Sequence, residues 1–177
     1  VTSSLLNLLD FLKDKCECNL LIFNENSELI NKIPRKVNII RHENVLSILG
    51  LSQSETKEKS LMLYVFRAFL VILAKFFNGR FARMFLFRLI KKRSEYDLGI
   101  SYTHDVNWNS LTTGCNQFVT DIVLAKRKVA YVHCDFLRYG GFNSKMIRLY
   151  EQFDNIICVS EGCKRSFDTC FPILSNK

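Results

Sequence analysis

One stretch in the second half of the chain reads Lys128-Val129-Ala130-Tyr131-Val132-His133-Cys134-Asp135. Its apolar run is continuous and too short for a helix, which is typical of a buried strand over 129–133. Polar residues follow at once, because His133 and Asp135 stand where this strand ends. A buried strand with polar residues at its carboxyl end favours a parallel sheet, and open sheets of that kind bind ligands at this edge.

Similar strands recur along the chain and alternate with helical segments. We expect strands over 19–23, 37–40, 97–102, 129–133 and 156–159. Leucines at 5, 8, 9 and 12 have the spacing of an amphipathic helix. Further helices are expected in several pieces over 44–94, and over 111–125, 143–153 and 161–171. This alternation predicts an α/β domain, a Rossmann-like parallel sheet of at least five strands with helices on both faces.

The ends of two predicted strands carry the candidate site. Tyr102, His104 and Asp105 lie at the end of the strand over 97–102, and His133 and Asp135 follow the strand over 129–133. Each has a plainer alternative. His133 can bond a nearby backbone carbonyl, Asp135 can be a turn residue that bonds its own backbone, and 102–105 can be a solvated loop.

Three motifs in the C-terminal half carry a resemblance to a known family. They are Tyr96-Asp97-Leu98-Gly99-Ile100-Ser101-Tyr102, the stretch over 128–135, and the stretch over 150–167 with Cys158-Val159-Ser160-Glu161 at its centre. In this order and spacing they resemble the N-terminal domain of family 4 glycosyltransferases, in particular bacterial enzymes that build capsular, exopolysaccharide or lipopolysaccharide sugars. The resemblance covers 96–173 well, 1–40 loosely, and 44–94 only in position and character.

The resemblance implies a GT-B fold, in which two Rossmann-like domains face each other across a cleft. Residues 1–177 would form the acceptor-side domain of a retaining enzyme that moves a sugar from a nucleotide-sugar to a glycan or lipid-linked acceptor. It implies no metal or other cofactor, and the sequence contains no Asp-x-Asp carboxylate pair. Family members begin with a strand and a glycine-rich loop and add a second domain with paired glutamates. We therefore expect this chain to be cut at both ends and inactive alone.

The resemblance also implies roles for the candidate residues. A histidine at the position of His133 faces the cleft, where a neutral imidazole hydrogen-bonds a sugar hydroxyl or the charge that develops at the reaction centre. Tyr102, His104, Asp105 and Asp135 would bind the acceptor. The nucleotide-sugar would be held mostly by the second domain.

Positive charge is concentrated in one segment of the sequence. The net charge is +8, and residues 61–94 contain eight cations and no acidic residue. These cations are Arg67, Lys75, Arg80, Arg83, Arg88, Lys91, Lys92 and Arg93. Aromatic residues interleave with them: Tyr64, Phe66, Phe69, Phe76, Phe77, Phe81, Phe85 and Phe87. The uncharged runs are too short to span a bilayer, so we expect all eight cations at an anionic membrane surface. The alternative is a core helix pair with a solvated basic face.

Cysteine usage and the absence of certain motifs indicate the compartment and the class of partner. The chain has seven cysteines, an odd number, without metal-site spacing or a signal peptide, which indicates a reducing cytosol. No nucleic-acid recognition motif is present, so we expect no nucleic-acid partner. The expected location is cytoplasmic, peripheral at the inner face of the cell membrane. The alternative function is a non-catalytic α/β module that binds anionic membrane or nucleic acid.

Overall fold

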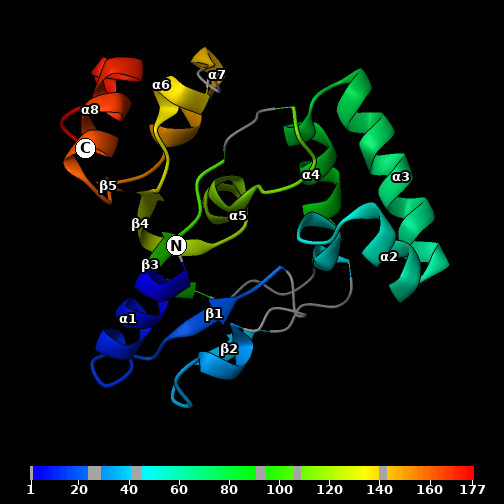
Figure 1. The fold of residues 1–177 in the computed structure, drawn as a ribbon, viewed down its shortest axis with the longest axis horizontal. Helices are drawn as coiled ribbons and strands as arrows, with labels where there is room; N and C mark the ends of the chain where they lie inside the picture. The colour runs from blue at the N-terminus through cyan, green and yellow to red at the C-terminus, as the bar shows by residue number, and fades with distance from the viewer. Residues whose placement is uncertain (1, 24–28, 41–44, 91–94, 106–108, 140–142) are drawn as a thin grey trace. The chain divides into compact units, whose positions relative to one another are not determined.

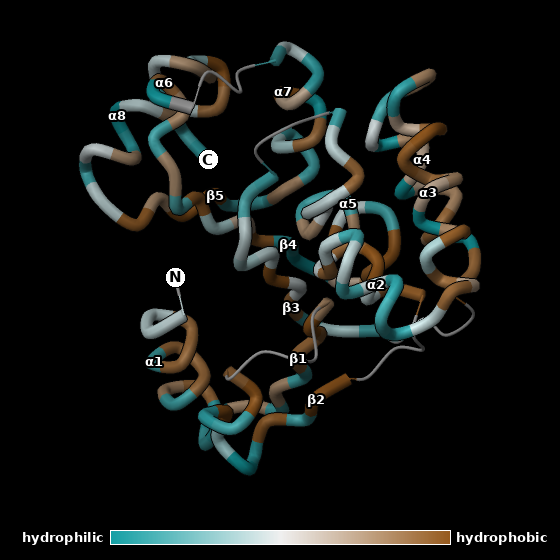
Figure 2. The backbone as a smooth tube through the Cα atoms, turned by 45° about the vertical axis from the view of Figure 1, so that its right-hand side comes forward, coloured by the Kyte–Doolittle hydropathy of each residue, from teal (hydrophilic) through white to brown (hydrophobic). Residues whose placement is uncertain are grey.

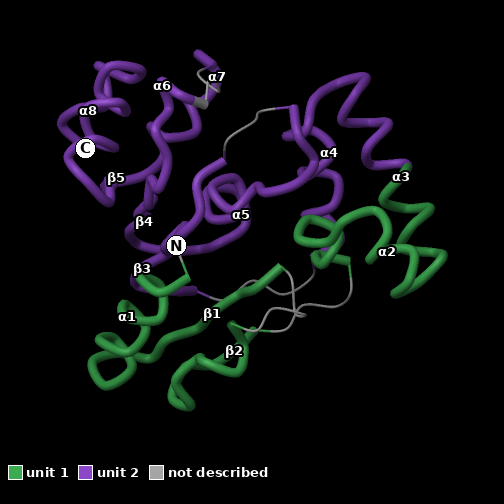
Figure 3. Tube along the Cα trace, in the orientation of Figure 1, with its two compact units in different colours: residues 1–68 green, residues 69–177 purple. Residues whose placement is uncertain are grey.

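The chain forms two compact units, each with its own parallel sheet (Figures 1 and 3). A computed structural model describes residues 2–23, 29–40, 45–90, 95–105, 109–139 and 143–177. Unit 1 is Val1–Ala68 and unit 2 is Phe69–Lys177. The boundary falls inside helix α3 (Leu61–Phe76), so the C-terminal half of α3 belongs to unit 2.

Unit 1 is built around one pair of short strands. Its elements before α3 are α1 (Thr2–Leu12), β1 (Asn19–Leu21), η1 (Ile30–Lys32), β2 (Asn38–Ile40), η2 (Leu46–Leu49) and α2 (Gln53–Lys59). β1 and β2 are parallel, with Asn19 opposite Asn38. Helix α2 begins with a capping box, because Ser52 and Glu55 each accept a hydrogen bond from the other's backbone N–H.

Unit 2 contains a three-stranded parallel sheet with the order β3-β4-β5. Its elements after α3 are α4 (Gly79–Phe87), β3 (Glu95–Ser101), α5 (Cys115–Asp121), β4 (Leu124–Val132), α6 (Phe136–Tyr139), α7 (Ser144–Tyr150), β5 (Asn155–Cys158), α8 (Glu161–Cys170) and η3 (Pro172–Leu174). Ile100 lies opposite Val129, and Tyr131 lies opposite Ile157. All three strands therefore end at the same edge of the sheet.

The core of unit 2 lies on one face of this sheet. Ala130 and Val132 of β4 are fully buried, and the alternation of side chains along a strand puts them on the same face. Helix α5 packs against β3 and β4, and α8 packs against β5 (Figure 1). The apolar cluster on this face also contains Met146, Tyr150, Phe153, Phe167 and Phe171. The intervening residues Tyr131 and His133 point to the other face and are half-buried.

The α/β class and the parallel strands are confirmed, but the number of strands in one sheet differs from the prediction. Five strands are described, close to the predicted positions, and every pairing is parallel. They form sheets of two and three strands instead of a single sheet of five. No helix within the described ranges has the length and apolar character needed to cross a membrane.

The predicted helix over 111–125 is shorter in the structure. Helix α5 starts only at Cys115, because Thr113 and Gly114 have positive φ angles of 72° and 96° that interrupt a right-handed helix. A side chain at position 114 would collide with the side chain of Arg83, so glycine meets two requirements there. At its other end, α5 stops at Asp121 and β4 already begins at Leu124.

Candidate functional site at the carboxyl edge of β3 and β4

Three aromatic rings meet where β3 and β4 end. Tyr102 follows β3 and His133 follows β4, and their ring centroids are 4.9 Å apart. Tyr131, two residues before His133 on the same face of β4, lies 4.8 Å from Tyr102 and 6.0 Å from His133, nearly parallel to the imidazole at 18°. We call Tyr102, Tyr131 and His133 the ring cluster. The structure thus brings Tyr102 and His133 together, as predicted, and adds Tyr131.

His133 is held as a neutral imidazole. Burial lowers its pKa, and a hydrogen bond to the Tyr102 backbone acts in the opposite direction. The Nε2 atom of His133 is buried and has no hydrogen-bond partner among the described residues. One side of the ring is therefore fixed by the backbone, while Nε2 keeps its hydrogen-bonding capacity for another group.

His104 lies near His133, and its pKa is lowered as well. Burial lowers the pKa of His104, and the neighbouring His133 lowers it further. Its Nδ1 is also buried without a partner within the described ranges, and its ring is 6.4 Å from the ring of Phe136. Two imidazoles with lowered pKa values and unused nitrogen atoms therefore lie at the same edge of the sheet.

Asp105 lies beneath this edge instead of at its surface. It is only 3% exposed, and its Oδ1 accepts a hydrogen bond of 2.7 Å from the backbone N–H of Gly114, which precedes α5. Burial raises its pKa, against the opposing effects of Arg83 and of backbone N–H groups at the start of α5. This burial favours a structural role for Asp105 over the predicted contact with an acceptor.

Asp135 is engaged in capping the short helix α6. Its Oδ1 accepts hydrogen bonds from the backbone N–H groups of Leu137 at 3.1 Å and Arg138 at 3.3 Å, and from the Ser166 hydroxyl at 2.6 Å. The bond from Ser166 is the main reason that the pKa of Asp135 is lowered. These contacts fit the turn alternative for Asp135, and its contact with an acceptor stays a prediction.

A buried polar network connects α4 to α5, and it corrects the prediction for Arg83. Arg83 is 1% exposed; its Nε donates a 2.8 Å hydrogen bond to Gln117 Oε1, and a terminal nitrogen donates to the carbonyl of Ser110. The inner face of α4 consists of positions 79, 82, 83, 86 and 87, which have helical spacing, so Arg83 faces the core. The prediction that Arg83 lies at a membrane surface was wrong.

The other predicted membrane-surface cations have different environments. Arg67 is buried, which makes its placement at the surface wrong as well. Arg80 is half-buried and forms a 3.5 Å ion pair with Asp121. Lys75 and Arg88 are exposed, so their position at a membrane surface stays a prediction. Lys91, Lys92 and Arg93 lie outside the described residues.

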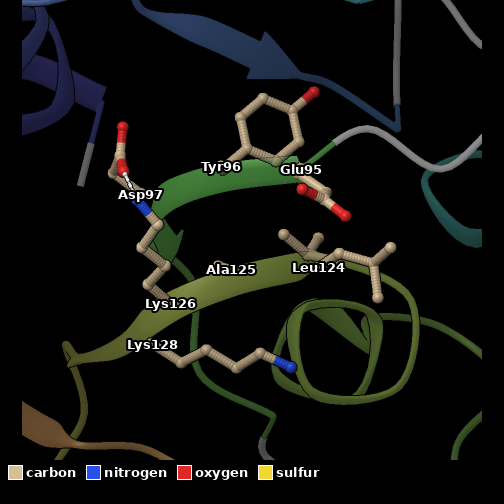
Figure 4. Close-up of a pocket in the computed structure, with 8 residues that line it drawn as sticks. Glu95, Tyr96, Asp97, Leu124, Ala125, Lys126 and Lys128 are labelled. Atoms are coloured by element: carbon tan, nitrogen blue, oxygen red, sulfur yellow. Dashed lines mark hydrogen bonds and ion pairs between the residues drawn. The ribbon is translucent and has the colours of Figure 1, made fainter.

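A shallow hollow of about 530 Å³ lies at the opposite, amino edge of β3 and β4 (Figure 4). Its rim carries an exposed ion pair, in which Lys126 Nζ is 2.6 Å from Asp97 Oδ1. Lys128 also lines the hollow, but its Nζ donates a 2.8 Å hydrogen bond to the backbone of Thr120 in α5. Asp97, Lys126 and Lys128 are thus engaged with each other or with the backbone, and we place the candidate site at the ring cluster instead.

The described residues contain no group of three or more His, Cys, Asp or Glu side chains that could hold a metal ion. Sequence reasoning missed Tyr131, although the period of two along a strand puts it on the same face as His133. No family model, no curated protein and no solved structure matches the chain.

Proposed function

We propose that this chain is the acceptor-side half of a retaining GT-B glycosyltransferase, which transfers a sugar from a nucleotide-sugar to a glycan or lipid-linked acceptor. The observation that carries the proposal is the ring cluster with its neutral His133. It lies at the carboxyl edge of parallel strands, the edge at which open α/β sheets bind their ligands. The motifs that resemble family 4 glycosyltransferases include both Tyr102 and His133.

The chemistry of the ring cluster suits a sugar. Tyrosine rings combine an apolar body with a polar tip, so Tyr102 and Tyr131 can pack against the C–H face of a pyranose, and a phenolic hydroxyl can hydrogen-bond a sugar hydroxyl. Nε2 of His133 can hydrogen-bond one hydroxyl or the charge that develops at the reaction centre. Because burial disfavours the imidazolium, we assign His133 the role of a neutral hydrogen-bonding group.

The order of the strands is compatible with the proposed fold. In a doubly wound sheet the strands lie in the order 3-2-1-4-5-6. Taken separately, the neighbours β1 and β2 in unit 1 and the sequential order β3-β4-β5 in unit 2 are each compatible with parts of that order. In the proposed enzyme the nucleotide-sugar donor is held mainly by the second domain. The proposed reaction needs no metal or cofactor, and it takes place at the inner face of the cell membrane.

The competing function is a non-catalytic α/β module that binds anionic surfaces. Exposure of Lys75 and Arg88 favours it, whereas burial of Arg67 and Arg83 removes two of the cations on which nucleic-acid binding would depend. A module of this kind has no need for His133. The two functions therefore predict different effects of a His133 substitution: it lowers the rate of transfer in an enzyme and has no effect on binding in a non-catalytic module.

The experiment is a transfer assay on the full-length protein. Nucleoside diphosphate release is measured with a panel of nucleotide-sugars and a glycolipid extract as the acceptor. We expect His133→Ala to lower kcat about 100-fold, as for loss of one preorganised hydrogen-bonding group, with little change in stability. Lys126→Ala, at the amino edge of the same strand, is the matched control and should keep full activity. Equal activity of the two variants would exclude the proposed role of His133.

A further inference from the structure

The outer surfaces of α3 and α4 in unit 2 carry a row of exposed apolar side chains. In the C-terminal half of α3 these residues have spacings of three and four, and further exposed apolar residues follow in α4. Figure 2 shows hydrophobic positions in both helices. Phe76 is 81% exposed and Phe77 is 63% exposed, the largest fractions in the row. The apolar face of α3 and α4 consists of Phe69, Ile72, Phe76, Phe77, Phe81, Met84, Phe85 and Leu89.

Ring contacts join exposed aromatic residues of α3 to those of α4. The ring of Phe69 on α3 meets the ring of Phe85 on α4 edge-on at 6.1 Å, and Phe77 lies 5.0 Å from Phe81. The opposite face of α4 is buried through Ala82, and Arg83 is bonded to α5 there. Helix α4 is therefore fixed from its inner side, while its outer side presents aromatic rings.

The charge around this face selects its partner. The sequence from 61 to 94 contains no acidic residue, so nothing within this segment repels an anionic surface. Lys75 on α3 and Arg88 at the end of α4 are exposed close to the aromatic residues in sequence. Exposed aromatic residues with nearby cations are the pattern of a helix that lies in the interface of a membrane with anionic lipids.

We infer that the apolar face of α3 and α4 inserts into the headgroup region of an anionic lipid bilayer, with Lys75 and Arg88 beside the lipid phosphates. The aromatic rings are the main source of binding, because Arg67 and Arg83 are buried and cannot reach the lipid. Binding is therefore partly resistant to salt, unlike attachment by cations alone. The inference concerns unit 2 alone and does not depend on glycosyl transfer.

The test is co-sedimentation of the full chain with vesicles of phosphatidylcholine, with and without phosphatidylglycerol. Phe76→Ala combined with Phe77→Ala should lower the partition coefficient about tenfold per ring on the anionic vesicles. The matched control is Leu137→Ala combined with Ile173→Ala, which truncates two apolar residues that are 58% and 72% exposed elsewhere in unit 2. This control should bind as the unchanged chain does.

A second pair of variants separates charge from insertion. Lys75→Gln combined with Arg88→Gln should weaken binding about fivefold per cation at low salt and have less effect at high salt. Lys145→Gln combined with Arg148→Gln is the control with two exposed cations outside the segment. The inference is overturned if the Phe76/Phe77 variant binds like its control. It is also overturned if the unchanged chain does not bind vesicles and forms a dimer, while the Phe76/Phe77 variant is a monomer, because the face would then bind a second copy.

Discussion

Replacing Arg83 by methionine tests the buried network that joins α4 to α5. Methionine approximates the length of the arginine side chain but donates no hydrogen bond, so the change removes the bonds while keeping most of the volume. Two acceptors lose their partner, the Gln117 side-chain oxygen and the Ser110 carbonyl. A buried acceptor left without a partner costs about 1–3 kcal/mol, so the free energy of unfolding should fall by about 2–6 kcal/mol.

Urea denaturation followed by circular dichroism measures this loss. With a typical dependence of about 1–3 kcal/mol per molar urea, the midpoint should fall by about 1–3 M. The matched control is Arg88→Met on an exposed side chain near the end of the same helix, which should change stability by less than about 0.5 kcal/mol. If Arg83→Met and Arg88→Met have the same midpoint, Arg83 is not part of a buried network and the reasoning fails.

Two further predictions concern the carboxyl edge of the sheet. Asp135→Ala should lower the melting temperature by about 2–4 °C, since α6 loses its cap. Asp135→Asn should lower it less, because the amide oxygen still accepts a hydrogen bond. A loss of turnover without any loss of stability would instead favour a contact with the sugar acceptor. The pKa values of His104 and His133 are lowered in the folded chain, so the unfolded chain takes up more protons below about pH 6.5 and stability should fall as the pH decreases from about 7 to about 5. The double change His104→Gln with His133→Gln should flatten this dependence in urea titrations, and an unchanged slope would mean that the two imidazoles are not shielded from protons.

The periodicity of the sequence predicted the positions of the strands better than their lengths. The predicted stretches covered most of β3 and β5 and the C-terminal half of β4, but β4 begins at Leu124, ahead of the predicted 129. Its first residues include Lys126 and Arg127, and an exposed polar stretch gives no apolar signal. Pairing of Glu95 with Leu124 extends the strand there, which depends on a neighbour far away in the sequence.

The site could be predicted only partially, because strand ends are visible in the sequence while burial is not. Tyr102 and His133 were found from their positions at the ends of two parallel strands, and their rings are in contact. Arg83 was misplaced, because its hydrogen-bond partner Gln117 comes 34 residues later and no local pattern marks such a pair. The Thr113-Gly114 turn was missed for a similar reason: only the glycine indicates that α5 starts late.

The same buried contacts link the two surfaces that the proposals use. Arg83 ties α4 to Gln117 of α5, and the backbone N–H of Gly114, just before α5, is bonded to Asp105. Asp105 adjoins His104, whose imidazole interacts with that of His133. The apolar face of α3 and α4 and the ring cluster thus belong to one compact unit and are joined through buried polar groups. A membrane that holds this face would therefore also fix the position of the ring cluster, which suits a site that must meet a lipid-linked acceptor near the bilayer surface.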